Sequence, residues 1–490
     1  MKRHSNPDLL IVVLAILALL SACATNPVTG KKELVLVSEA QEIQIGQAGA
    51  QQVNQEMGLY DDPDLEAYVS ELGMRLARSS ERPNIPWQFH VLDSPIVNAF
   101  ALPGGPVYLT RGILSHMNSE AAMVGILGHE IGHITARHSV QQISRAQLAG
   151  IGMGVGMIFV PEVRPYGDLI QTGLGVLFMK FSRDDERESD TLGVRYSLTA
   201  GYDASEMASF FDVLQRLGER SGQSIPSWMS THPDPQDRQA RILQQVQTSG
   251  NSIELATREE DFLHRIEGMV FGENPRQGFM DGSRFKHPDL KFQLDFPQDW
   301  KVQNMPLTVM AAEPGGGAAI QLTASRVQQG VRPDAYGESF FRQHSLEYRT
   351  GERIRVGSFQ AYRAPFRARI SAGYVLGEAG FIRDGELMYE ILAYTMQSNF
   401  DRYRRTFQQV ISSYDRLRDR DALNIQPQRI KLYRVPETMK LRQAFVRTDV
   451  EEEMMSELAL ANNAELDDII EAGTLVKIVE GKMPPGSQPR

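Results

Sequence analysis

The sequence AAMVGILGHEIGHITAR, residues 121–137, contains the pattern H-E-x-x-H. Residues four apart lie above one another on one face of an α-helix, so the imidazoles of His129 and His133 can bind the same metal ion. Glu130 lies beside that face, where it can act on a molecule at the metal's open position. Apolar residues recur at three- and four-residue steps and Ser119 is a suitable N-cap, which predicts a buried helix. The alternative is an amphipathic surface helix with two solvated histidines.

A third metal ligand is expected because a catalytic zinc ion usually has three protein ligands and one position open to water. Glu186, within the charged run SRDDERESD at 182–190, is the candidate. Asp190 follows it by four residues and therefore lies on the same helical face, where it can accept a hydrogen bond from a ligating imidazole. Glu188 is the competing ligand, but no acid follows it by four residues. The alternative for such a run is a solvated helix face.

The composition is that of a globular protein with several domains. The 490 residues are enough for about three domains on a prior of roughly 150 residues each. Hydrophobic residues make up 42% of the chain and charged residues 23%, so a sizeable core can be buried. The formal net charge is -10, and no stretch forms the basic face that nucleic-acid phosphates require. Nucleic acid is therefore excluded as a partner.

Residues 1–22 have the order of an export signal, with two basic residues, an apolar run at 9–20 and small residues before Cys23. The run is shorter than the roughly 20 residues that span a bilayer. The residues LSAC at 20–23 resemble the bacterial lipoprotein box, which implies cleavage before Cys23 and a lipid anchor on it. Ala24 is typical of outer-membrane lipoproteins of Gram-negative bacteria, so the body would be periplasmic. Cys23 is the only cysteine, which excludes an intrachain disulfide, and a buried thiol or metal ligand is its alternative role.

Two short strands are predicted just before the metal helix, on either side of the turn PGGP at 103–106. Asn98, Ala99 and Phe100 belong to the first of them. An extended peptide substrate can add to the edge of a sheet as a further strand, so these residues are candidates for the substrate strand. The alternative is an ordinary hairpin.

Four motifs in this order resemble the HtpX and CAAX prenyl endopeptidase family of zinc metallopeptidases. They are HEIGH at 129–133, the E-x-x-x-D of Glu186 and Asp190, NAFALPGG at 98–105, and THP at 231–233. Within the family, the chain resembles the periplasmic beta-barrel assembly-enhancing type, and the resemblance covers about residues 30–250.

The resemblance implies one Zn²⁺ per chain, bound by His129, His133 and Glu186, with Glu130 as the general base. His232 matches a histidine that approaches the metal in the family, where it would stabilise the oxyanion or act as an inhibitory fourth ligand. A solvated loop histidine is the alternative. His138 lies off the helical face of the ligand pair, and no role is expected for it.

Beyond a polar linker at 252–276 we predict a boundary near residue 275 and an α+β domain at 276–420. Its FPQDW at 296–300 and a final helix at 401–417 resemble the PsbP-like fold. Residues 425–480 resemble a LysM-type module, although Pro-Glu replaces the glycine expected before its first helix. Residues 481–490 are a tail. A LysM module would make peptidoglycan a partner, and a small α/β cap is the alternative.

The sequence therefore predicts an α+β chain: a mainly helical zincin-type (gluzincin) peptidase domain at 23–275 with a small sheet, an α+β domain, and a LysM-like module. The expected function is that of a zinc endopeptidase that cuts envelope proteins in quality control. One alternative is a periplasmic chaperone whose metal site is closed by His232 or by the glycine-rich residues 148–160. The other is a peptidoglycan peptidase.

Overall fold

The computed structural model describes residues 23–152, 180–220, 227–232, 235–250, 254–370 and 373–481. The predicted leader at 1–22, most of the glycine-rich segment and nearly all of the tail lie outside them. The described residues form two compact units of mixed helices and strands. Unit 1 contains residues 23–271 and 429–480, and unit 2 contains residues 272–428 with Gly481. Among the described residues, no helix is both long and apolar enough to cross a membrane.

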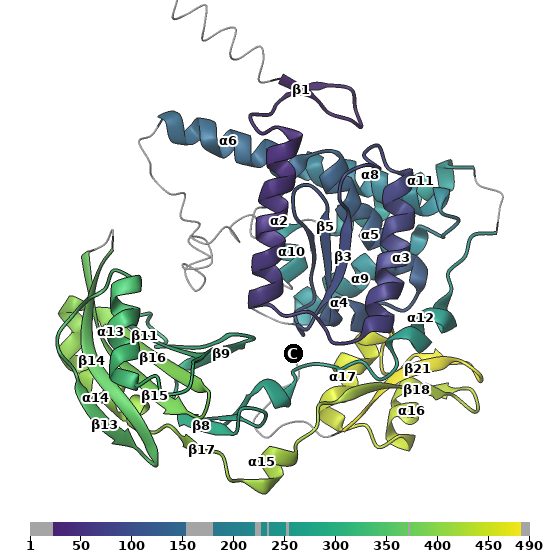
Figure 1. Cartoon of the computed structure of the whole chain (residues 1–490). Helices are drawn as coiled ribbons and strands as arrows, with labels where there is room; N and C mark the ends of the chain where they lie inside the picture. The colour runs from purple at the N-terminus through teal and green to yellow at the C-terminus, as the bar shows by residue number, and fades with distance from the viewer. Residues whose placement is uncertain are drawn as a thin grey trace, which may run out of the picture. The chain divides into compact units, whose positions relative to one another are not determined.

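Unit 1 is mainly helical, as predicted for the part that carries the candidate site (Figure 1). Its helices are α2 (Glu39–Glu56), α3 (Pro63–Ser79), α4 (Arg111–His116), α5 (Glu120–Thr135), α6 (His138–Gly152), α8 (Arg183–Thr199), α9 (Ser205–Arg220), α10 (Ser227–Thr231), α11 (Pro235–Thr248), α12 (Glu259–Ile266), α16 (Leu441–Arg447) and α17 (Glu452–Ala461). Its strands are β1 (Cys23–Thr25), β2 (Lys32–Leu34), β3 (Gln88–Leu92), β4 (Ala99–Ala101), β5 (Pro106–Thr110), β18 (Arg429–Arg434), β19 (Met439–Lys440), β20 (Ile469–Ile470) and β21 (Leu475–Glu480).

The predicted metal helix is α5, and every one of its residues is buried. Ser119 caps it, because its hydroxyl accepts a hydrogen bond from the backbone N–H of Ala122. Helix α8 crosses α5 closely because glycines lie where the two meet. A Cβ on Gly193 would be 3.1 Å from the backbone nitrogen of His129, and one on Gly132 would be 3.1 Å from Cα of Ser189. The small residues thus let α8 bring its acids to the histidines of α5.

A three-stranded sheet lies beside the helices in the order β3-β5-β4. Strand β3 runs parallel to β5, and β4 runs antiparallel to it. The predicted pair of strands around the PGGP turn is therefore confirmed as β4 and β5, and β4 lies at an edge of the sheet.

Unit 2 is built on an eight-stranded sheet whose path is β12-β14-β15-β16-β11-β10-β9, with β13 paired to β14. The predicted strands near residues 292, 320 and 389 are confirmed as β8, β11 and β16. Its helices are η3 (Pro275–Gln277), α13 (Pro333–Gln343), η4 (Gln397–Asn399), α14 (Phe400–Ser412) and α15 (Arg420–Asn424). Its strands are β6 (Phe279–Asp281), β7 (Arg284–His287), β8 (Phe292–Asp295), β9 (Lys301–Met305), β10 (Thr308–Ala312), β11 (Ala318–Arg326), β12 (Glu347–Tyr348), β13 (Glu352–Val356), β14 (Phe359–Ile370), β15 (Gly373–Asp384), β16 (Leu387–Met396) and β17 (Asp415–Arg416).

Two sequence predictions about helices were wrong. The helix predicted at 401–417 is α14, which ends at Ser412, and the chain continues as strand β17, which pairs with β8. Tyr414 and Leu417 belong to this extended segment and are buried. In the sequence, these two apolar residues were mistaken for a continuation of the helix. The predicted linker at 252–276 contains helix α12, which buries Phe262, Leu263 and Ile266. The segment was taken for a polar linker because the first turn of this helix is acidic.

The C-terminal segment, residues 429–480, belongs to the same compact unit as the metal helix. The backbone N–H of Ile430 donates to the carbonyl of Met269 (2.9 Å), and that of Gly268 donates to the carbonyl of Ile430 (2.8 Å). Arg434 makes two hydrogen bonds to Glu260 on α12, of 2.9 and 3.1 Å. The chain thus leaves unit 1 after residue 271 and re-enters it at residue 429, where Ile430 pairs with Gly268 and Met269.

Lys477 of β21 is a buried basic residue in this segment, because only 1% of it is exposed. Its Nζ donates to the carbonyls of Ser115 (2.9 Å) and Met117 (2.7 Å), at the end of α4. Burial lowers the pKa of Lys477 well below its usual value. Asn118, which follows Met117, donates from its side-chain amide to the carbonyl of Ala461 (3.1 Å) in the C-terminal segment. The C-terminal segment therefore holds the connection that leads into the metal helix.

We expect Lys477→Met to loosen this connection, because the two carbonyls lose their buried donor at a cost of about 1–3 kcal/mol. Hydrogen exchange should become faster at residues 115–118 and in β21, and the thermal unfolding temperature should fall. Lys431→Met on β18 is the control, because that side chain is 52% exposed. Unchanged exchange at residues 115–118 in the Lys477 variant would show that the contact does not support the connection.

Candidate metal centre

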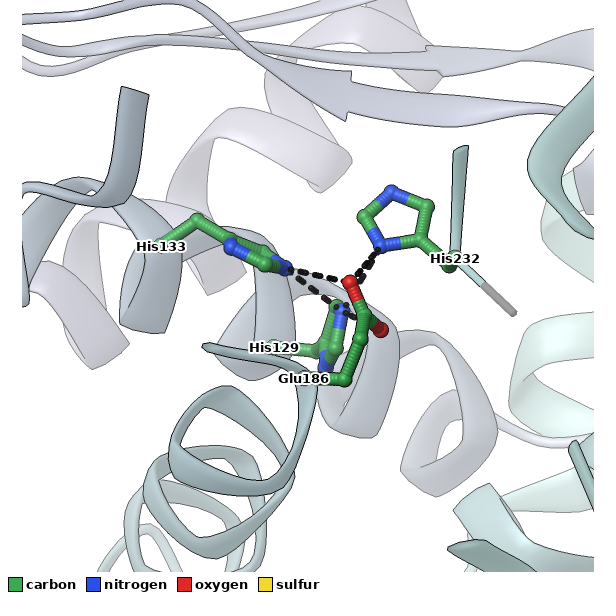
Figure 2. Close-up of side chains that lie close together, drawn as sticks. All are labelled: His129, His133, Glu186 and His232. Atoms are coloured by element: carbon green, nitrogen blue, oxygen red, sulfur yellow. Dashed lines mark hydrogen bonds and ion pairs between the residues drawn. The ribbon is translucent and has the colours of Figure 1, made fainter. Parts of the chain in front are cut away.

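Four buried side chains from three parts of the chain meet at helix α5. His129 and His133 come from α5, Glu186 comes from α8, and His232 directly follows α10 (Figure 2). Each offers a ligand atom, and these atoms all lie within 4.8 Å of one another. The sequence analysis placed all four residues at the site, and the structure brings them together.

The distances show that the ligand atoms converge on one small volume. Nε2 of His133 lies 3.0 Å from Nε2 of His129. Nδ1 of His232 lies 3.3 Å from Nε2 of His129 and 2.9 Å from Oε1 of Glu186. Three imidazoles and a carboxylate directed at one point form the kind of nitrogen and oxygen donor set that binds zinc and similar metals. The residues present therefore fit a metal ion.

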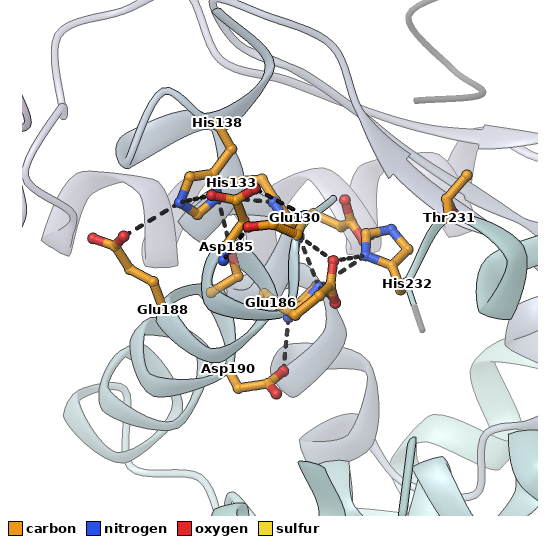
Figure 3. Close-up of polar contacts among 12 residues, drawn as sticks. Glu130, His133, His138, Asp185, Glu186, Glu188, Asp190, Thr231 and His232 are labelled. Carbon is orange, nitrogen blue, oxygen red and sulfur yellow. Dashed lines mark hydrogen bonds and ion pairs between the residues drawn. The ribbon is translucent and has the colours of Figure 1, made fainter. Parts of the chain in front are cut away.

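Glu186 and Glu188 lie on different sides of α8, which separates the two competing candidates. Oε1 of Glu186 lies 3.5 Å from Nε2 of His133, and its Oε2 lies 3.6 Å from Nε2 of His129. Glu188 is directed at His138 and does not belong to the cluster (Figure 3). The geometry thus favours Glu186 as the third ligand, as the spacing of the acids indicated.

Glu130 lies next to the cluster with a free carboxylate oxygen. The residue is 1% exposed, and within the described part of the chain its Oε1 has no hydrogen-bond partner. That oxygen lies 3.7 Å from Nε2 of His232. A buried carboxylate oxygen without a donor is able to accept a proton from a molecule that enters the site.

Asp190 supports His129, as its position four residues after Glu186 indicated. Its Oδ1 lies 3.0 Å from Nδ1 of His129, so the other ring nitrogen of His129 is directed at the cluster. Burial by itself would raise the pKa of Asp190, but the guanidinium of Arg238 and the imidazole of His129 hold that pKa well below its usual range. The aspartate is therefore ionised at neutral pH.

Arg238, on α11, was missed in the sequence analysis although it is the principal cation of the site. It donates to both carboxylate oxygens of Asp190, at 2.8 and 2.7 Å. Its Nη1 lies 2.8 Å from Oε2 of Glu186. The guanidinium also lies over the rings of Phe211 and Trp228, at 4.5 and 4.8 Å from their centroids. One arginine thus balances the charges of two buried acids.

The buried charges also set the protonation of the other groups. Burial and then the neighbouring imidazoles of His129 and His138 lower the pKa of His133 well below its usual value. Burial would lower the pKa of His232 as well, but Glu186 and Glu130 outweigh it and raise that pKa. Burial would raise the pKa of Glu186, but His232 and Arg238 lower it. A neutral His133 and an ionised Glu186 are the forms that bind metal.

Two further residues near the site were not expected from the sequence. The indole of Trp228 stacks on the ring of His232, with centroids 4.7 Å apart and planes 20° from parallel. His138, for which no role was expected, has its Nδ1 3.0 Å from Nδ1 of His133. That expectation assumed one continuous helix, but α5 ends at Thr135.

The predicted substrate strand occupies the edge strand β4 and the residue before it. Asn98 is half-buried, whereas Ala99 and Phe100 are 0% and 7% exposed. The ring of Phe100 stacks on Tyr108 within the core, so its side chain serves packing. A contact with substrate stays a prediction for these residues. Cys23 begins β1 and pairs with Leu34, and its lipidation likewise stays a prediction.

We expect Arg238→Met to destabilise the metal-free protein strongly, because it leaves Asp190 and Glu186 buried without their cation. Removing one partner of a buried ion pair costs about 3–5 kcal/mol. Urea unfolding in the presence of a chelator measures the loss. Arg195→Met on α8 is the control, since Arg195 is 49% exposed and its surface pair with Glu81 should be worth at most about 1 kcal/mol. Equal, small losses in both variants would contradict the role assigned to Arg238.

Comparison with known proteins identifies part of the chain. Residues 63–246 match the model of Peptidase family M48. Mitochondrial metalloendopeptidase OMA1 of Arabidopsis thaliana is 34% identical over 196 residues, which is 40% of this chain and 38% of that protein. The beta-barrel assembly-enhancing protease of Escherichia coli (strain K12) is 29% identical over 227 residues, which is 44% of this chain and 46% of that protein. The chain thus spans less than half the length of these relatives.

Among solved structures, PsbP from Synechocystis sp. PCC 6803 aligns with 27% of this chain and 91% of its own, with 12% identity and a TM-score of 0.25. The PsbP-like and LysM-like assignments accordingly stay predictions. The match of residues 63–246 agrees with the metallopeptidase resemblance, and the site lies within that range. Residues 63–246, less than half of this chain, are thus similar to Peptidase family M48.

Proposed function

We propose that the chain is a zinc endopeptidase that hydrolyses peptide bonds of envelope proteins. The observation that carries this proposal is the convergence of His129, His133 and Glu186 beside the free carboxylate oxygen of Glu130. The names of the relatives, a metalloendopeptidase and a protease, support the same class of reaction. A purely binding protein would have no need of a buried base at this point.

The residues would hold and use the ion as follows. His129, His133 and Glu186 would bind it, and a donor set of two imidazoles and a carboxylate suits zinc. When bound, zinc supplies Lewis-acid chemistry toward water and toward a peptide carbonyl. Glu130 accepts the proton of the attacking water and then donates it to the leaving amine. Asp190 fixes the ring of His129 throughout.

We assign His232 to the fourth position, as an inhibitory ligand that closes the site. Its Nδ1 lies 2.9 Å from Oε1 of Glu186, within the cluster of ligand atoms. Its ring is held there by the indole of Trp228. A group that stabilised an oxyanion would instead leave this position to the substrate. The alternative function, a chaperone with a latent metal site, rests on the same closure.

The proposed setting is the cell envelope. By its leader sequence the protein would be exported and anchored through lipid on Cys23 to the outer membrane of a Gram-negative bacterium, with its body in the periplasm. Its substrates would be misfolded or misassembled proteins there. Peptidoglycan is a further proposed partner, which residues 425–480 would bind.

Glu130→Gln should abolish proteolysis and retain the metal, because the amide cannot take up a proton while the three ligands are untouched. We expect casein cleavage to fall by roughly 10²- to 10⁴-fold, with an unchanged zinc content by atomic absorption. Glu219→Gln, at an exposed position on α9, is the matched control. A chelator should silence the wild type and the control alike. Full cleavage by the purified Glu130 variant would refute the assigned base.

His232→Ala should increase the cleavage of an unfolded substrate such as casein, because it opens the fourth position to water. The zinc content should stay at one ion per chain, since three ligands remain. Lower activity with unchanged zinc would instead assign His232 to the stabilisation of the oxyanion, and would remove the argument for a closed site.

A further inference from the structure

A sharp turn after the metal helix places the ring of His138 beside the ring of His133. Helix α5 ends at Thr135, and helix α6 begins at His138. Between them, Arg137 has a φ of 63°, in the left-handed region that few residues other than glycine adopt. Its guanidinium donates to Glu42 (2.9 Å) and to the carbonyl of Val37 (3.0 Å), which holds the turn. The fold therefore fixes the place of His138 instead of leaving it on a solvated helix.

His138 connects His133 to an acid of α8. Its Nδ1 lies 3.0 Å from Nδ1 of His133, and its Nε2 lies 3.3 Å from Oε2 of Glu188 (Figure 3). Asp185 is a second, more distant acid, with its Oδ1 3.8 Å from the same Nε2. Both imidazoles are 1% exposed, so solvent does not replace these contacts.

When both rings are neutral and Nε2 of His133 keeps its lone pair, the partners of the other three nitrogens determine where the hydrogens lie. The hydroxyl of Ser189, 3.4 Å from Nδ1 of His138, is a further and longer contact. Nε2 of His133 is directed at the cluster, 3.5 Å from Oε1 of Glu186, and must keep its lone pair to bind a metal. Its Nδ1 then carries the hydrogen and donates to Nδ1 of His138. His138 carries its own hydrogen on Nε2, which faces the carboxylate of Glu188 as acceptor.

We propose that His138 is a positioning residue that fixes the ring and the tautomer of His133, with Glu188 holding His138 in turn. It does for His133 what Asp190 does for His129. The inference rests on the proposed function, because it assumes that Nε2 of His133 binds the ion. Partners of metal-bound histidines typically contribute 10- to 100-fold in metal affinity.

Packing alone is the competing explanation. Phe181 stacks on the ring of His133, with centroids 3.9 Å apart, and this contact also restrains the plane of the ring. A phenyl ring, however, cannot select which nitrogen carries the hydrogen. The two explanations therefore differ in what a hydrogen-bond acceptor at position 138 should restore.

The test compares His138→Leu with His138→Asn in the full chain. Leucine fills space without an acceptor, whereas Oδ1 of asparagine stands close to where Nδ1 of histidine was. The zinc dissociation constant is measured by competition with a coloured chelator, and circular dichroism and thermal unfolding of the metal-free proteins check that each variant folds. His264→Leu, at a histidine on α12 whose side chain is 56% exposed, is the control.

We expect the leucine variant to bind zinc 10- to 100-fold more weakly than the wild type, and the asparagine and control variants to bind it within a few-fold of the wild type. Wild-type affinity in the leucine variant would overturn the inference. An equal loss in both His138 variants would also overturn it, because packing would then be the cause. A wild type that binds no zinc would instead refute the proposed function.

Discussion

The close crossing of helices α5 and α8 is the constraint on which the metal centre depends. Two histidines one turn apart on α5 can share an ion with an acid of α8 only if the backbones nearly touch. Gly132 and Gly193 permit this, since a Cβ at either position would stand 3.1 Å from backbone atoms of the other helix. The same crossing sets the register of α8, so that Glu186 meets the imidazoles and Asp190 meets His129. A larger residue at the crossing would separate the ligands before it disturbed any single one of them.

Buried side chains also make hydrogen bonds to both ends of α5. At its first turn, the phenol of Tyr68 donates to the buried Glu120 (2.6 Å). At its last turn, Arg82 donates to the carbonyl of Ile134 (2.9 Å) and is paired in turn with Glu42 (2.7 Å). Buried charges of this kind gain little net stability, because removing them from water costs about as much as their pairing returns. Their value lies in position, since each fixes one end of the helix that carries the histidines.

Local spacing was sufficient to predict helix α5, its N-cap and the position of Glu186, rather than Glu188, beside the two histidines, because each depends on residues within one or two helical turns. It was insufficient for Arg238, which reaches Asp190 from a helix 48 residues later. The available signal was an arginine on the buried face of α11, four residues before the buried Ile242. The helical pattern also misled, because it was extended past Thr135 to His138 across a turn that depends on the side chain of Arg137. Lys477 gave no signal at all, since its partners are backbone carbonyls.

The helix before His232 is shorter than the helices that carry the other three residues of the cluster. Helix α10 has five residues. The backbone N–H of Trp228 donates to the carbonyl of Val97 (3.3 Å), and the carbonyl of Thr231 accepts from the backbone N–H of Phe181 (3.3 Å). The three proposed ligands, in contrast, lie on two long helices that are locked together by glycine contacts. Val97 lies two residues before the edge strand β4, so the helix that precedes His232 is hydrogen-bonded to the chain that leads into the predicted substrate strand.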